Sequence, residues 1–121
     1  MYVKQITPIL NVSDLHASFV WFQKLGWRKC WDWGDPPDFG SVGSGEVEIF
    51  LCVNGQGSPG VWLTWWVASP ADVDAAHESA LANGLAVTVP PKDEPWGVRE
   101  CHIRHPDGHT FRVSCGIKGG A

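Results

Sequence analysis

The fold is decided by the stretch ITPILNVSDLHASFVWFQKLGW, residues 6–27. Its first part belongs to a strand-like segment, residues 5–12. Ser13 and Asp14 are favoured N-cap residues that begin a helix, and Gly26 ends it. Apolar side chains recur on one face of that helix at Leu15, Phe19, Phe22 and Leu25. The stretch therefore predicts a β-strand that leads directly into an amphipathic helix.

The same order of elements occurs twice along the chain. Strand-like segments follow the first helix at residues 27–33, 39–43 and 46–53, and NGQGSPG (54–60) has the composition of a linker. The second half gives a strand at 61–67 and a helix that Ser69 caps, with Pro70 in its first turn and Asn83-Gly84 at its end. Segments 85–89, 98–104 and 110–115 follow, separated by the long loop PPKDEPWG (90–97) and the turn HPDGH (105–109). The chain therefore predicts one α+β domain, residues 1–121, built from two βαβββ modules at about 1–55 and 61–116.

One helix for every four strands covers only one face of a sheet. Side chains alternate along each strand, so Leu63 and Trp65 point to the covered face while Trp62 and Trp66 point to the other. We therefore expect a half-open mixed sheet whose second face forms a polar and aromatic cleft.

Composition excludes several classes of partner and compartment. The 121 residues carry a formal net charge of −4, which argues against nucleic acid and anionic membrane surfaces. The amino end lacks the layout of a signal peptide, and no apolar run reaches membrane-spanning length. The four cysteines show no zinc-type spacing and lie in apolar, strand-like runs, which favours reduced thiols in a cytoplasmic protein over a disulfide.

Tryptophan is the compositional outlier, with eight residues against one tyrosine. A core seldom needs so many indoles, whereas a stacking surface at an interface or ligand site does. Parity assigns Trp21, Trp27 and Trp65 to the core or an interface.

Two stretches together resemble one known family. Residues 6–27 resemble the opening of proteins of the glyoxalase/bleomycin resistance/dioxygenase (vicinal oxygen chelate) superfamily, and DEPWGVRECHIRHPDGHTFRVS (93–114) resembles the end of their second module. The resemblance implies a homodimer, with or without exchange of modules between chains. It is strongest to the metal-free, drug-binding branch that includes bleomycin resistance proteins.

Enzymes of that superfamily hold a divalent metal on the open strand faces. Carried over, three of the ligand positions fall at Thr7, near Trp62 and at Arg112. Threonine is a weak ligand, the indole has no acceptor lone pair, and the guanidinium puts a positive charge where the cation would sit. Glu48 is the only nearby carboxylate predicted on this face, so we expect neither a metal nor another cofactor.

The candidate ligand-binding residues are the aromatic and polar side chains predicted on the cleft face or its bordering loop. They are Trp31, Trp33, Phe39, Glu48, Phe50, Trp62, Trp66, Trp96, His102 and Arg112. Two interpretations of Arg112 remain open: it hydrogen-bonds a ligand oxygen, or it pairs with Glu48. His105 and His109 flank the PDG turn and are attributed to its polarity.

These features favour metal-independent binding and sequestration of a bulky aromatic antibiotic or natural product, for drug resistance or the self-immunity of a producer. The expected partners are that ligand and a second copy of the chain. No spacing indicates a catalytic nucleophile with its base, so a non-enzymatic role is favoured. The alternatives are a lyase, transferase or dioxygenase of the same superfamily, and a carrier protein in natural-product biosynthesis.

Overall fold

The computed structural model describes residues 1–55 and 60–117 of the chain. It divides the chain into two compact units, Met1–Pro59 and Gly60–Ala121, which we call module 1 and module 2 and describe separately. The predicted linker 54–60 contains this boundary, but its residues 56–59 lie outside the described part.

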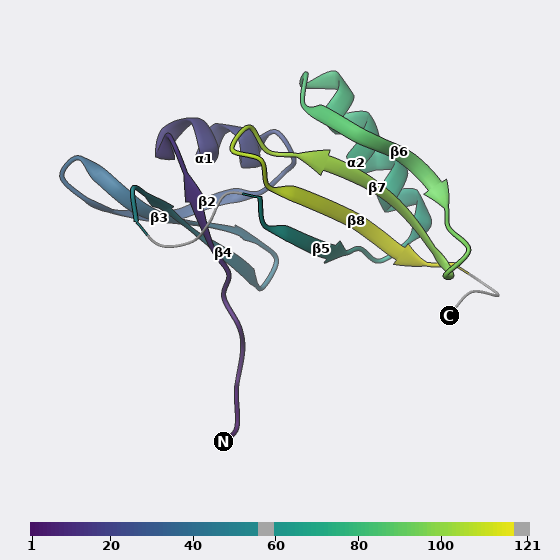
Figure 1. The fold of residues 1–121 in the computed structure, drawn as a ribbon, viewed down its shortest axis with the longest axis horizontal. Coiled ribbons are helices and arrows are strands. Elements are labelled where there is room, and N and C mark those ends of the chain that lie inside the picture. Colours follow the sequence, from purple (N-terminus) through teal and green to yellow (C-terminus); the bar gives the residue numbers. More distant parts are fainter. Residues whose placement is uncertain (56–59, 118–121) are drawn as a thin grey trace. The chain divides into compact units, whose positions relative to one another are not determined.

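Each module is one helix and a four-stranded mixed sheet. Module 1 contains β1 (Ile9–Val12), α1 (Leu15–Gln23), β2 (Arg28–Gly34), β3 (Pro37–Ser44) and β4 (Val47–Val53). Module 2 contains β5 (Trp62–Trp66), α2 (Pro70–Ala82), β6 (Ala86–Asp93), β7 (Val98–Arg104) and β8 (Thr110–Gly116). The strand orders are β1-β4-β3-β2 and β5-β8-β7-β6, and in each sheet only the first pair is parallel (Figure 1). The predicted α+β class and duplicated βαβββ order are confirmed.

Both helices begin where side-chain caps were expected. The Asp14 carboxylate accepts a hydrogen bond from the Ala17 backbone N–H at 2.8 Å, so Asp14 rather than Ser13 is the cap of α1. Ser69 Oγ accepts from the Asp72 N–H at 3.2 Å at the start of α2. Gly26 adopts a φ of 84°, which favours glycine, just after α1.

The core of module 1 lies between α1 and its sheet. Phe22 of α1 is fully buried, as are Leu10 of β1 and Leu51 of β4. Trp21 and Trp27 are also buried and contact the Phe22 ring edge-on, with centroids 5.1 and 5.5 Å from it. Both indoles are therefore core residues, as their parity predicts.

The core of module 2 forms between α2 and the opposite parity of β7 and β8. Val73 and Ala80 of α2 are buried, as are Ile103 and Phe111. Trp65 stacks on Phe111 with ring centroids 4.2 Å apart, which confirms its placement on the helix-covered face. The strand faces assigned from alternation are thus correct.

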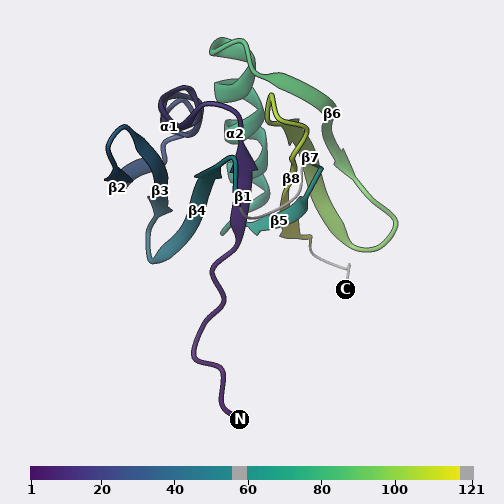
Figure 2. The ribbon, with the colours of Figure 1, turned by 60° about the vertical axis from the view of Figure 1, so that its left-hand side comes forward.

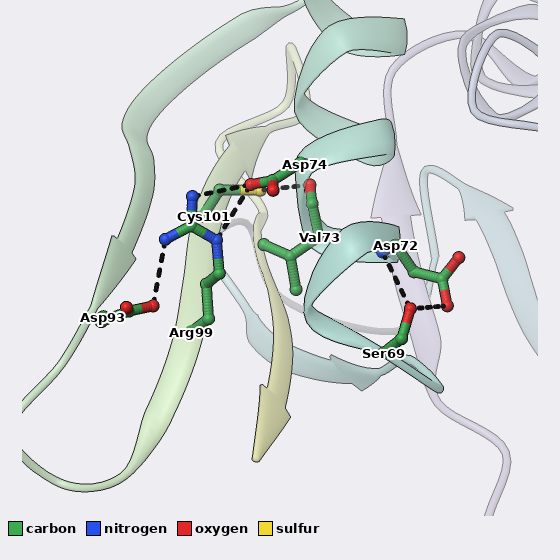
Figure 3. A network of polar contacts seen from close by, with 7 residues as sticks. All are labelled: Ser69, Asp72, Val73, Asp74, Asp93, Arg99 and Cys101. Carbon is green, nitrogen blue, oxygen red and sulfur yellow. Dashed lines mark hydrogen bonds and ion pairs between the residues drawn. The ribbon is translucent and has the colours of Figure 1, made fainter. Parts of the chain in front are cut away.

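A polar network also ties α2 to the sheet of module 2 (Figure 3). Arg99 of β7 donates to Asp74 of α2 from Nε at 2.9 Å and from Nη2 at 2.8 Å, and its Nη1 donates to Asp93 of β6 at 3.0 Å. The Cys101 thiol donates to the Val73 carbonyl at 3.9 Å. Burial raises the pKa of Cys101 to about 11, so the thiol stays protonated and able to donate. All four cysteines are free, as predicted.

Two boundaries differ from the sequence prediction. The first strand begins at Ile9 rather than at residue 5, and the chain before it runs away from the sheet (Figure 1). Pro8 has no N–H to donate, and the parallel register of Ile9 on Phe50 would set residue 5 opposite residue 46, before β4 begins.

The stretch 90–97, expected to be a long loop, is the second difference. β6 continues through Pro90 and Pro91 to Asp93, so that β6 and β7 form a long hairpin (Figure 2). β6 is an edge strand, where a proline can lack a ladder N–H, and its pairing with β7 shifts register around these prolines.

Candidate functional site

The face of each sheet opposite its own helix is called here its open face. In module 2 the central residue of this face is Arg112 of β8. Its register partners are Thr64 of β5 on one side and His102 of β7 on the other. Trp62 and Trp66 lie two residues before and after Thr64, so strand alternation puts them on the same face. Four predicted site residues, Trp62, Trp66, His102 and Arg112, are therefore brought together.

An ion pair lies at the middle of this open face. Arg112 Nε donates to Glu100 Oε2 at 2.8 Å, and Arg112 Nη2 donates to Glu100 Oε1 at 3.2 Å. The Glu100 side chain is 2% exposed, whereas that of Arg112 is 36% exposed. The pair is thus asymmetric, with a buried carboxylate and a guanidinium that reaches the surface.

Three further side chains surround the Glu100 carboxylate. Trp96 Nε1, from the turn between β6 and β7, donates to Oε1 at 3.1 Å, and Ser114 Oγ donates to Oε2 at 3.3 Å. His102 Nε2 lies 3.5 Å from Oε2. Both carboxylate oxygens are therefore used by partners within the module.

The ion pair controls the protonation of both groups. Burial acts to raise the pKa of Glu100, but hydrogen bonds and charge from Arg112, with a smaller contribution from His102, outweigh it and hold that pKa below its ordinary value. The hydrogen bond to Glu100 in turn raises the pKa of Arg112. At neutral pH the site is an ion pair, not a neutral acid beside a base.

Exposed indoles surround the ion pair. Trp62 is 60% exposed, Trp66 is 69% exposed and Trp96 is 54% exposed. Trp62 also meets the His102 ring edge-on, with centroids 5.6 Å apart. These rings are held by the sheet and by the Trp96–Glu100 hydrogen bond, while much of their apolar surface is free to be covered.

The open face of module 1 carries a second group of predicted residues. Trp31 stacks on Phe39 with centroids 5.9 Å apart, and Phe50 meets both rings edge-on, at 5.3 Å from Trp31 and 5.6 Å from Phe39. Trp33 pairs in register with Phe39 and is exposed. Glu48 of β4 accepts a hydrogen bond from the buried Ser41 hydroxyl. The aromatic rings and Glu48 are therefore on one face, as parity predicted.

One predicted contact is wrong, and one important residue was not singled out. In the part of the chain that the structure describes, Arg112 pairs with Glu100 of its own module and not with Glu48. Glu100 shares the parity of His102 on β7, so strand alternation could have placed it on this face. Its burial, which makes it the natural partner of Arg112, has no signal in the sequence.

The two histidines of the PDG turn are more than polar turn residues. His105 and His109 are both buried, and their Nδ1 atoms accept hydrogen bonds from the backbone N–H groups of Asp107 at 3.0 Å and Val61 at 3.2 Å. Burial lowers the pKa of His105 to about 4. Both side chains therefore organise the turn and the entry to β5 rather than the open face.

The donor set of the module 2 open face does not suit a divalent metal. Its carboxylate, Glu100, already accepts from Arg112, Ser114 and Trp96, and the guanidinium would repel a cation at this point. Within residues 1–55 and 60–117, no three His, Cys, Asp or Glu side chains form a group that could hold a metal ion. The arrangement is instead suited to stacking on flat rings and to donating hydrogen bonds from Arg112.

No helix in the described part of the chain is long and apolar enough to cross a membrane.

Comparison with known proteins gives one family. The family described as Glyoxalase/Bleomycin resistance protein/Dioxygenase superfamily matches residues 3–113. No curated protein matches the sequence.

Solved structures share this fold at low sequence identity. A glyoxalase/bleomycin resistance protein/dioxygenase from Nocardioides is 23% identical, with a TM-score of 0.76 over 98% of this chain and 89% of that one. TioX from Micromonospora sp. ML1 is 19% identical, with a TM-score of 0.81 over 95% of this chain and 100% of its own. A bleomycin resistance determinant encoded on the transposon Tn5 is 15% identical, with a TM-score of 0.77 over 96% of this chain and 100% of its own. At these identities the similarity concerns the fold alone.

Proposed function

The chain belongs to the glyoxalase/bleomycin resistance protein/dioxygenase superfamily, and from this premise we propose that it binds and sequesters a bulky aromatic natural product, without a metal and without transforming it. The observation that carries the proposal is the open face of module 2. Three exposed indoles surround an ion pair whose carboxylate is already satisfied. A drug-binding role is supported by the shared fold of the bleomycin resistance determinant from Tn5.

The energetics of such a face favour a flat, largely apolar ligand. Covering apolar indole surface is worth roughly 25 cal/mol per Å2, and each well-placed ring contact adds about 1 kcal/mol. A rigid ligand that covers two or three indoles could reach micromolar to nanomolar affinity after the cost of association. Because the indoles are fixed on strands or tethered to Glu100, little side-chain entropy is lost on binding.

The open face of module 1 takes part in the same proposal. Trp31, Phe39 and Phe50 form a continuous aromatic surface, and Trp33 extends it at one end. Glu48 gives this face a carboxylate that can accept a hydrogen bond from a hydroxyl or amine of the ligand. We assign both open faces to ligand binding, with module 2 supplying the indoles that are most exposed.

A binding titration with matched variants tests the proposal. Purified protein is titrated with bleomycin-type, quinone and enediyne-type compounds while tryptophan fluorescence is recorded, and the recovered compound is checked by mass spectrometry. We expect saturable quenching at a fixed stoichiometry and an unchanged compound. Trp62→Ala and Trp66→Ala should each weaken binding roughly tenfold, about 1.4 kcal/mol. Leu81→Ala removes an exposed apolar side chain of α2, away from the open face, and should leave binding unchanged.

Three results would contradict the proposed function. Fluorescence unaffected by every compound would show that the indoles bind none of these classes. Equal losses in Trp62→Ala and Leu81→Ala would place binding elsewhere. A chemically altered compound would favour an enzyme of the superfamily instead.

The cellular role is tested separately. We assign the protein to drug resistance or self-immunity in the cytoplasm, where its four cysteines would stay reduced. Expression in a sensitive host should allow growth on the bound drug, and unchanged sensitivity despite tight binding would favour a biosynthetic carrier.

We also propose a homodimer, since a second copy would cover exposed sheet edges such as β6. Sedimentation should give twice the mass of the chain, and a monomer at the concentrations used for binding would contradict this part of the proposal.

A further inference from the structure

The two buried or half-buried arginines of β7 and β8 use their nitrogens differently. Arg99 engages all three side-chain nitrogens with protein carboxylates: Nε and Nη2 with Asp74, and Nη1 with Asp93 (Figure 3). Arg112 engages only Nε and Nη2, both with Glu100. In the described part of the chain, Arg112 Nη1 has no printed protein partner, so the edge formed by Nη1 and Nη2 retains donors directed away from the carboxylate.

Glu100 fixes the direction of that edge. A guanidinium is planar, so two hydrogen bonds from one edge to a carboxylate determine the plane and orientation of the other edge. Glu100 cannot easily reorient, because it is buried and also accepts from Ser114 and Trp96. The unused edge of Arg112 is therefore preorganised before any ligand arrives.

Stability alone does not explain this arrangement. A buried ion pair contributes little compared with apolar residues of similar volume, because the charges must be desolvated. Arg99 shows that this fold can satisfy an arginine completely when it ties elements together. Arg112 instead presents one edge at the centre of a face that carries Trp62 and Trp66.

The geometry points to a ligand that carries two adjacent oxygen atoms on an aromatic ring, and we infer that the free edge of Arg112 donates one hydrogen bond to each oxygen. The inference rests on the proposed function and names the chemical class of its ligand. Two parallel N–H groups match two neighbouring acceptors, as in a catechol or an ortho hydroxy-carbonyl group, and a single oxygen would use only one of them. Because Glu100 compensates the charge of Arg112, the ligand can be neutral.

The indoles determine where the rest of the ring system lies. Trp62 and Trp66 are four residues apart on β5, a separation of about 13 Å along an extended strand. Arg112 is opposite the midpoint of this span, because its register partner is Thr64. A fused-ring compound held by Arg112 at its oxygens can therefore extend toward either indole.

A pair of isomers tests the inference. In 2,3-dihydroxynaphthalene the oxygens are adjacent, and in 2,6-dihydroxynaphthalene the same atoms are at opposite ends of the rings. Isothermal titration calorimetry at neutral pH should give the 2,3 isomer at least a tenfold lower Kd. Arg112→Lys keeps the charge beside Glu100 but lacks the planar edge, so the preference should fall below threefold while the 2,6 isomer binds as before.

Two controls separate the ligand contact from a loss of structure. The double variant Glu100→Gln/Arg112→Gln removes both charges together and should also lose the preference, with circular dichroism confirming the fold. Arg99→Lys alters the arginine of the structural network and should keep the tenfold preference. A preference that survives Arg112→Lys would overturn the inference.

The isomers also distinguish the inference from the proposed function. Equal binding of both isomers, or binding of neither while the larger aromatic compounds still quench fluorescence, would overturn the inference alone. Failure of the isomers and of every larger compound would overturn both.

Discussion

The charge pair on the open face of module 2 predicts an unequal response to loss of each partner. Glu100 is 2% exposed and Arg112 is 36% exposed, so the carboxylate cannot turn to water when its partner is removed but the guanidinium can. Arg112→Gln should therefore destabilise the protein much more than Glu100→Gln at pH 7.

The magnitudes follow from burial and from the remaining hydrogen bonds. Removing one partner of a buried pair costs about 3–5 kcal/mol, and we expect the lower end for Arg112→Gln because Ser114 and Trp96 still donate to Glu100. Glu100→Gln should cost about 1 kcal/mol, the value of an ordinary hydrogen bond, because Arg112 can become solvated. The double variant should cost less than the sum of the two, which shows coupling between neighbours.

The pH dependence gives an independent check. In the native protein the pKa of Glu100 is held below its ordinary value, mainly because Arg112 outweighs burial. Without Arg112, burial would instead raise that pKa, so the folded variant binds a proton more readily than the unfolded chain. Stability from such a raised pKa is lost as pH rises, so the deficit of Arg112→Gln should be larger at pH 7 than at pH 5.

Urea unfolding followed by far-ultraviolet circular dichroism measures these differences without depending on indole fluorescence. The free energies of unfolding of the wild type, the two single variants and the double variant are compared at both pH values, with the slopes checked for equality. Equal costs for the two single variants, or a deficit that does not change with pH, would refute the reasoning.

Three further perturbations test the scaffold. Gly40→Ala would place a Cβ 2.5 Å from Phe19 Cζ, so the free energy of unfolding should fall by about 1–3 kcal/mol, and an unchanged thermal midpoint would contradict that packing. Ser69→Ala removes the acceptor for the Asp72 N–H and should cost about 1 kcal/mol in urea unfolding, whereas Ser69→Asp should retain most of the stability. Because burial lowers the pKa of His105 to about 4 from 6.5, its contribution is present above pH 6.5 and is lost as pH falls toward 4; His105→Asn should flatten the stability profile over that range, and an unchanged slope would contradict it.

The faces of the strands could be predicted because alternation is a local property. Trp62 and Trp66 share a parity on β5, and so do Glu100 and His102 on β7, whatever the strands pair with. Capping and periodicity likewise located both helices. The boundary of β6 was missed because Pro90 and Pro91 are ordinarily excluded from strands, and only the sheet order shows that β6 is an edge strand.

The sequence by itself determined the duplicated βαβββ pattern and the parity of the tryptophans, because caps, turns and alternation act over a few neighbouring residues. Only the tertiary structure decided the partner of Arg112. The antiparallel register sets His102 opposite Arg112 and Glu100 opposite Ser114, and burial then makes Glu100 the carboxylate that fixes the guanidinium. Pairing between strands depends on the register of the whole sheet, and burial depends on everything packed around the side chain, so neither is encoded in the spacing of residues along the chain.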